Sequence, residues 1–348
     1  MSDAPDVLDA HIHLWDPYRT PRASSPFVRA LGRQEALMQR VVQRLSPPEA
    51  LAFLGNPRFV LNRYMPTEHR ARAGARLRDY VHVEAGYVAL PPLGAARESR
   101  WLRTLRDGPR GVVGAADLTS RFLPQLLDAH QREHPGFRGV RDKLAFSEAP
   151  GVKSWAAAPA RCERLAFRRG YALLGERGLS FDAFVYSPQL DELARLVEAH
   201  PETPVVLCHL GTPVALEGPF GGLGGTRAAR HEVATRWRAG LQRLAASPHV
   251  RVKLSGMLMP VVGFGFHTRP APPSASELYE RLGPHLRFAL ETFGPERCMF
   301  GSNFPIDAVS TTYDALLEAL ERTMRDMALD PDAQRAVLAD TARRFYRL

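Results

Sequence analysis

The sequence predicts an α/β fold of the (β/α)8 TIM-barrel class, with long loops after some strands forming a lid. Three observations predict it. Short apolar, β-branched runs recur along the chain, amphipathic segments separate them, and three of the connections are too long to be turns. Eight such units fit 348 residues. An open doubly wound sheet is the alternative on this pattern. We expect residues 1–348 to form a single domain.

The expected elements alternate in type along the whole chain. Strands are predicted at 7–13, 81–84, 111–117, 137–141, 179–186, 204–209, 250–255 and 298–302. Helices are predicted at 97–106, 122–132, 162–176, 189–199, 226–246, 277–293 and 313–325. The long connections 17–79, 211–225 and 259–276 follow strands one, six and seven. They leave the carboxyl ends of strands, where barrel enzymes build their active sites.

Composition and charge exclude several classes of protein. The chain is 45% hydrophobic and 24% charged, which excludes disorder, collagen and coiled coil. No apolar run is long enough to span a membrane, and the acidic N-terminus does not resemble a secretory signal, so we expect a cytoplasmic protein. The net charge of +9 comes from arginines spread among acids along the chain, which does not indicate nucleic-acid binding. The expected partner is a small-molecule substrate, and the sequence leaves a homo-oligomer open.

Histidines end two of the predicted strands. His11 and His13 lie two positions apart on strand one, so both side chains can face the mouth of the barrel. Two convergent imidazoles suit a divalent cation or acid–base chemistry. His209 closes strand six at the same rim, although a buried structural histidine is the alternative there.

Charged and polar residues end the other strands. Asn303 and Asp307 follow strand eight; we expect Asp307 to act as a general base, with a helix N-cap as the alternative. Glu84 ends strand two and Arg141 ends strand four. Lys253 lies in strand seven, where a buried lysine needs an anionic partner. That partner is either the substrate or an internal carboxylate.

Taken together, these motifs resemble the amidohydrolase superfamily, specifically its amidohydrolase-2 branch of metal-dependent TIM-barrel hydrolases, which includes sugar-lactone lactonases. The resemblance covers nearly the whole chain. It is carried by residues 9–17, 82–85, 98–101, 114–118, 139–141, 186–190, 209–211, 252–256, 298–307 and 342–348.

The resemblance implies roles for individual residues. His11 and His13 match the strand-one metal pair, and His209 matches the strand-six histidine. Two positions depart from the family pattern, because Ser187 replaces a frequent histidine and Asn303 replaces the metal-binding aspartate. Two imidazoles with neutral oxygens make a poor zinc site, so Glu84 or Asp307 would have to supply the missing charge. The cofactor is therefore either one divalent ion, zinc or manganese, or none, since some lactonases of this superfamily work without a metal.

We expect a hydrolase that opens a small cyclic ester, or next a cyclic amide, by attack of activated water. Catalysis is assigned to Asp307, His209, Lys253, Arg141 and Asn303, and metal binding to His11, His13 and Glu84. Substrate contacts are assigned to five loop residues: Trp15, Tyr64, Ser187, Phe264 and His267. A decarboxylase or lyase on the same barrel, or a binding protein that has lost catalysis, is the alternative.

Overall fold

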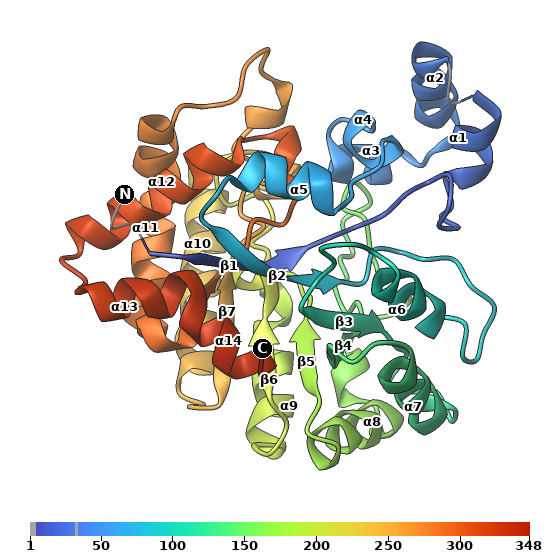
Figure 1. Ribbon diagram of the computed structural model, residues 1–348. Helices are drawn as coiled ribbons and strands as arrows, with labels where there is room; N and C mark the ends of the chain where they lie inside the picture. The colour runs from blue at the N-terminus through green and yellow to red at the C-terminus, as the bar shows by residue number, and fades with distance from the viewer. Residues whose placement is uncertain (1–4, 32–33) are drawn as a thin grey trace.

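The eight strands form one parallel sheet that curves into the predicted (β/α)8 barrel (Figure 1). The computed structural model describes residues 5–31 and 34–348. Each strand pairs with the next in sequence order, from β1 to β8. The strands are β1 (Val7–Ile12), β2 (Leu77–Val83), β3 (Gly111–Ala115), β4 (Phe137–Arg141), β5 (Ser180–Ala183), β6 (Val205–Leu207), β7 (Val250–Leu254) and β8 (Cys298–Phe300).

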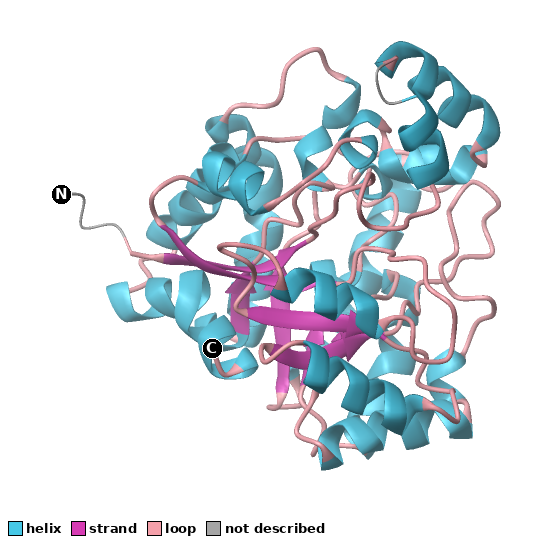
Figure 2. Cartoon of the chain, turned by 45° about the vertical axis from the view of Figure 1, so that its right-hand side comes forward, coloured by secondary structure: helices cyan, strands magenta, loops and turns pink. Residues whose placement is uncertain are grey.

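Helices surround the strands on the outside, as the colours of Figure 2 show. They are α1 (Ser25–Leu31), α2 (Glu35–Leu45), α3 (Pro48–Leu54), α4 (Arg58–Leu61), α5 (Pro66–Ala73), α6 (Ala96–Arg103), α7 (Leu123–Glu133), α8 (Leu165–Glu176), α9 (Leu190–Ala199), α10 (Arg227–Ala245), α11 (Ala275–Phe293), α12 (Tyr313–Asp326), α13 (Pro331–Arg335) and α14 (Thr341–Tyr346). None of the helices in the described part of the chain is long and apolar enough to cross a membrane.

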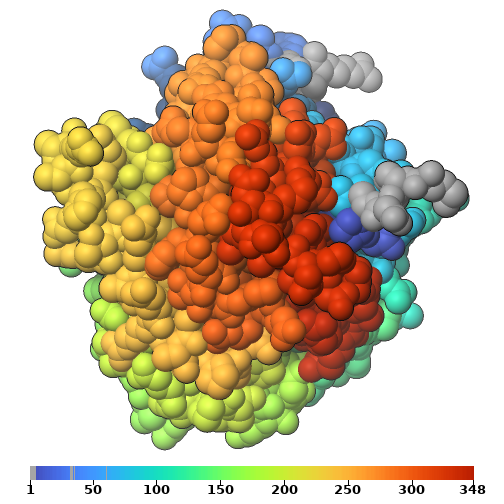
Figure 3. Space-filling view, turned by 90° about the vertical axis from the view of Figure 1, so that its left-hand side faces the viewer, coloured from blue at the N-terminus to red at the C-terminus, as the bar shows by residue number. Residues whose placement is uncertain are grey.

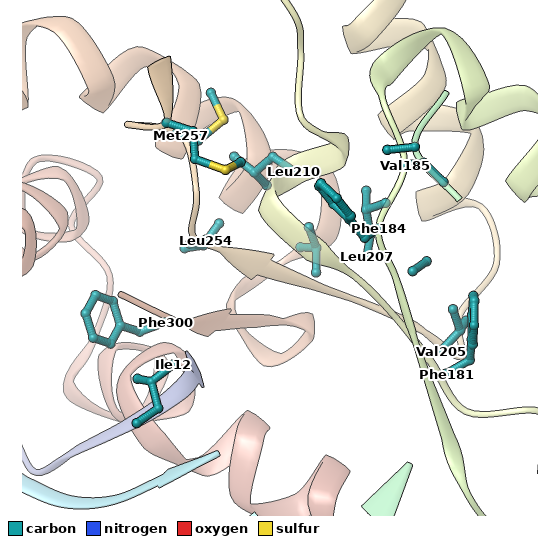
Figure 4. Close-up of a cluster of buried hydrophobic side chains, with 14 of the residues drawn as sticks. Ile12, Phe181, Phe184, Val185, Val205, Leu207, Leu210, Leu254, Met257 and Phe300 are labelled. Carbon is teal, nitrogen blue, oxygen red and sulfur yellow. The ribbon is translucent and has the colours of Figure 1, made fainter. Parts of the chain in front are cut away.

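Apolar side chains on the outer faces of the strands hold the helices in place. Phe181, Val205, Leu254 and Phe300 are all at most 3% exposed and belong to the main hydrophobic core. Figure 4 shows these residues with Ile12 around the strands of the barrel. Burial of such side chains contributes roughly 1.5–3 kcal/mol each, so this layer stabilises the packing of the helices on the barrel.

Strand four has the predicted bounds, whereas the other predicted strands extend past the observed ones at their carboxyl ends. Strand five, predicted at 179–186, is Ser180–Ala183, and strand six, predicted at 204–209, is Val205–Leu207. The apolar runs continue past the sheet because the following residues are buried in loops of the mouth. The connection predicted at 17–79 ends earlier, since β2 begins at Leu77, and it contains α1 to α5.

The C-terminal segment closes the amino-terminal end of the barrel, which the sequence analysis did not anticipate. Arg347 donates a hydrogen bond to the carbonyl of Gly178, just before β5, and Thr341 donates to that of Glu296, just before β8. Tyr346 packs with Leu8 of β1 and other inward-facing strand residues in a separate core. The red C-terminal region adjoins the orange α11 on the face shown in Figure 3.

A register shift in β1 determines where its histidines lie. The pairing of β1 with β2 is irregular between Asp9 and Ile12. The backbone N–H of Asn303 donates to the carbonyl of His11, and that of His13 donates to Phe304. These bonds join β1 to the segment after β8, so residues from the two ends of the chain meet at the mouth.

Candidate active site

His11 and His13 lie side by side at the carboxyl end of β1, and both are buried. Their Nε2 atoms are 3.2 Å apart. The Nδ1 atom of His13 lies 2.8 Å from the carbonyl oxygen of Val83, so it carries the proton of that hydrogen bond. The predicted convergence of the two side chains is therefore present.

A buried ion pair lies directly beneath the histidines. The Lys253 ammonium is 2.6 Å from Oδ2 of Asp182 and 3.3 Å from Nδ1 of His11. The hydroxyl of Tyr346 donates to the same carboxylate at 2.9 Å. Lys253 thus has the internal carboxylate partner, and it is not among the residues that line the cavity described below.

This arrangement assigns the protons of the histidine pair. An ammonium group has only donors, so Nδ1 of His11 accepts from Lys253. The remaining proton of neutral His11 is then on Nε2, where it is donated to His13. Burial lowers the pKa of both imidazoles well below its ordinary value, with Lys253 contributing at His11 and Arg141 at His13. Both rings are therefore neutral at pH 7.

His209 lies opposite this pair, with its ring centroid 4.4 Å from that of His11. Its backbone has the left-handed conformation (φ 56°), which costs energy for a residue other than glycine and is frequent at functional sites. Its Nδ1 is 2.9 Å from the hydroxyl of Ser255. Burial, with Arg141 next in effect, lowers the pKa of His209 well below its ordinary value.

A cavity of about 140 Å³ opens at the carboxyl ends of the strands. Its polar lining comes from β1, β2, β4, the loop after β6 and the segment after β8, and its apolar lining includes α3 residues and three aromatic rings. The polar and aromatic side chains of this lining include His13, Trp15, Arg22, Glu84, Arg141, Lys143, Trp155, Phe184, His209 and Asn303.

Glu84 is held by two cations in the wall of this cavity. Its Oε1 accepts from Arg141 Nε at 2.8 Å and lies 3.0 Å from Lys143 Nζ. Burial raises the pKa of this carboxyl, but Lys143 and Arg141 outweigh it and lower the pKa to about 2. Glu84 is consequently a fixed carboxylate that orients Arg141 and Lys143 and is a weak base.

Asp307 lies behind Asn303 rather than in the cavity wall. One carboxylate oxygen accepts from the Asn303 side-chain amide at 2.8 Å, and the other accepts from the Leu258 N–H at 3.3 Å. Burial raises the pKa of Asp307 to about 7, despite these two hydrogen bonds. The carboxylate bridges two loops and fixes Asn303, which itself has a left-handed backbone (φ 57°).

The five predicted substrate contacts are scattered. Trp15 lines the cavity. The hydroxyl of Tyr64 contacts His69, Ser187 begins the turn before α9, and Phe264 stacks on Phe266. His267 lines a different hollow, between α3 and the loops after β6 and β7. These last four are not among the residues that line the cavity.

Sequence reasoning missed several residues that shape the site. Asp182 interrupts an apolar strand, and the anionic partner that Lys253 requires was the signal that points to it. Ser255 and Gly256 lie two and three positions after Lys253. Arg22 and Trp155 come from irregular segments whose position no periodicity predicts.

A metal ion would find ligand atoms in two places. The atoms of His11, Asp182 and Cys208 lie within 4.8 Å of one another, but the Lys253 ammonium contacts the first two of these side chains. The second place is the pair of Nε2 atoms of His11 and His13, of which His13 lines the cavity. Ligands 2.0–2.1 Å from a tetrahedral ion are about 3.3 Å apart, which matches their separation.

A family model described as amidohydrolase matches residues 8–348. The chain belongs to the amidohydrolase family. The chain is 28% identical to the uncharacterized protein y4mH of Sinorhizobium fredii, over 100% of both chains. It is 33% identical to an L-fucono-1,5-lactonase of Burkholderia multivorans, over 68% of this chain and 71% of that one.

A solved structure gives the same family assignment. The chain resembles a zinc-bound amidohydrolase of Burkholderia multivorans, with a TM-score of 0.71, 25% identity and 99% of both chains covered. The resemblance to the amidohydrolase-2 branch inferred from the sequence motifs is thereby confirmed, and an amidohydrolase-family enzyme of the hydrolase type is supported.

Proposed function

We propose that this enzyme hydrolyses a small lactone in the cavity at the mouth of the barrel. The observation that carries the proposal is one cavity lined by both a neutral imidazole, His209, and the fixed cation Arg141. A neutral base and a cation placed to meet a developing oxyanion are what ester hydrolysis by water requires. The relative named L-fucono-1,5-lactonase adds support.

The size of the cavity favours a single ring. An engineered protein cavity of roughly 150 Å³ binds benzene, and this one measures about 140 Å³. Trp15, Trp155 and Phe184 offer ring faces, while Asn303 and Arg141 offer hydrogen-bond donors. A five- or six-membered lactone matches both the volume and this mixture of surfaces.

His209 is the general base in this proposal. Ser255 holds its Nδ1, and none of the residues that the structure describes bonds to its Nε2, which therefore faces the substrate. His209 takes a proton from water as the water oxygen bonds to the ester carbon. The carbonyl oxygen becomes an oxyanion beside Arg141. Collapse of this intermediate breaks the ring C–O bond, and His209 returns its proton to the leaving alkoxide.

In this proposal Asp307 acts by positioning Asn303 and does not itself accept a proton from the attacking water. Lys253 holds the proton positions of His11 and His13. Both differ from the direct catalytic roles that the sequence suggested for these residues, because neither side chain lines the cavity.

A divalent ion fits this site on one condition. His11 and His13 would hold it through their Nε2 atoms. Neutral His11 has its single proton on Nε2, so coordination there would require Lys253 to pass a proton to Nδ1 as the Nε2 proton leaves, and binding would release one proton. When bound, such an ion polarises a carbonyl and acidifies water. His209 and Arg141 keep the roles described above in either state.

The test offers the enzyme a panel of five- and six-membered lactones. Hydrolysis is measured as the release of acid, before and after treatment with a chelator. We expect turnover of at least one lactone and a loss of at least about 100-fold in His209→Asn. His231→Asn, on the exposed face of α10, is the matched control. Failure to open any lactone, or release of carbon dioxide from acids instead, would contradict the proposal.

A further inference from the structure

The cavity carries more positive than negative charge. Its lining contains the cations Arg22, Arg141 and Lys143 but one carboxylate, Glu84. The histidines are neutral, and Lys253 below them is balanced by Asp182. Glu98 lies behind the wall, where it accepts from the N–H of Ala85. Even with Glu98 included, cations outnumber carboxylates.

Arg22 accounts for the excess of positive charge in the cavity lining. Arg141 and Lys143 share Glu84, whereas Arg22 has no carboxylate within 4.0 Å among residues 5–31 and 34–348. One arm of its guanidinium donates to the carbonyl of Ala85, and its central carbon lies 4.4 Å above the ring of Trp15. Burial lowers its pKa to about 10, so it is still charged at neutral pH.

The loop fixes the backbone from which this side chain extends. The backbone N–H of Arg22 donates to the hydroxyl of Ser25 at 3.0 Å, and the carbonyl of Pro21 accepts from Val88 at 2.7 Å. Glu98 and Glu84 act on Arg22 electrostatically from beyond ion-pair distance. An arginine that is stacked on a ring, anchored by one arm and without an ion-paired carboxylate in the described part of the chain has the geometry of an anion receptor. The oxyanion of lactone hydrolysis does not explain it, because Arg141 already serves that atom.

We propose that the substrate is an anionic lactone, whose ring carries a carboxylate that pairs with Arg22. This inference rests on the proposed lactone hydrolysis and adds the charge of the substrate. Uncharged sugar lactones bind the same cavity without pairing Arg22 and are poorer substrates, since a buried cation without a partner is costly.

A first experiment measures binding without any reaction. Benzoate and benzamide have nearly the same shape and differ in charge, so calorimetry compares their dissociation constants. We expect benzoate to bind at least tenfold more tightly to the wild type, and Arg22→Met to remove this preference while Arg22→Lys restores part of it. Arg19→Met, in the same loop but with a side chain 81% exposed, is the matched control and should bind as the wild type does.

A second experiment separates this inference from the proposed function. Lactone pairs that differ only in a carboxylate and a hydroxymethyl group, such as D-glucaro-1,4-lactone and D-glucono-1,4-lactone, are compared by kcat/KM. Faster opening of the charged members, lost in Arg22→Met, supports the inference. Equal rates within the pairs, or an unchanged benzoate preference in Arg22→Met, overturn it and leave lactone hydrolysis standing. If no lactone is opened at all, the proposed function fails with it.

Discussion

At the residue scale, the site depends on side chains that their neighbours hold in a single position. His209 is held by Ser255 on one side, and Gly256 passes so close that a Cβ there would overlap its ring. Gly256 also has φ +64°, where other residues are strained. The glycine after Lys253-Leu-Ser is therefore needed for space as well as for conformation.

Gly256→Ala should displace the His209 ring and reduce turnover at least tenfold, because the ring of the proposed base then lies too far from the substrate. Gly74→Ala is the matched control: its φ is +72°, and nothing lies within 4 Å of the added Cβ. Steady-state kinetics and thermal unfolding of both variants check this. Equal losses of activity in the two would attribute the effect to backbone strain alone.

Asp307 should make stability depend on pH. Its pKa in the folded state is about 7, above the ordinary 3.8, so the folded state binds more protons than the unfolded state between these values. The free energy of unfolding then falls as pH rises through this window and levels off above about 7. From pH 5 to 8, the wild type should lose about 2 kcal/mol relative to Asp307→Asn, measured by urea unfolding. Parallel pH profiles would show that Asp307 is ionised throughout.

The sequence predicted these residues unevenly. His11, His13 and His209 were found because each ends an apolar strand, and strand ends meet at one rim. The role of Asp307 stays a prediction, since spacing along the chain does not distinguish a carboxylate in a cavity wall from one behind it. Arg22 left no signal at all, because its position depends on how an irregular loop folds back over Trp15.

At the element scale, the short α14 contributes to the site from the far end of the barrel. Tyr346 reaches Asp182, Asp182 pairs with Lys253, and Lys253 contacts His11. Four elements distant in sequence, α14, β5, β7 and β1, are thus connected around one buried carboxylate. The helix was missed in the sequence because six residues are too few to show an amphipathic period.

Tyr346→Phe removes one hydrogen bond to this carboxylate and should lower the free energy of unfolding by about 1–3 kcal/mol. It should also lower kcat more than it changes KM, since the proton positions of His11 and His13 depend on Lys253. Tyr171→Phe is the control, because Tyr171 is equally buried and its hydroxyl has no partner among the described residues. An effect on stability without any effect on kcat would make Tyr346 purely structural.

At the scale of the whole molecule, the fold was the most predictable property. Alternation of strand and helix along the chain predicts a parallel sheet, because parallel strands need crossover connections, and eight such units favour a closed barrel over an open sheet. Strand lengths and the C-terminal closure were not predictable, since both depend on packing between segments far apart in sequence.

Ending the chain at Asp340 should therefore destabilise the entire barrel. Ala342 and Tyr346 fill the same interior core as Leu8 and Met299, so their loss opens a cavity. We expect a loss of more than about 3 kcal/mol, seen as a lower midpoint of thermal unfolding. Arg347→Ala, which removes one exposed hydrogen bond, is the control. A truncated chain as stable as the control would show that α14 is dispensable.

The position of α14 also has a consequence for how the protein is made. Because α14 follows all eight strands in the chain, the residues that seal the interior around Asp182 and Lys253 are synthesised after the strands. A nascent chain can form its strands in order, as domains fold during synthesis, but its innermost charges stay open to water until α14 has left the ribosome. The reactive pocket is therefore completed only after the strands have formed, and from the opposite side of the protein.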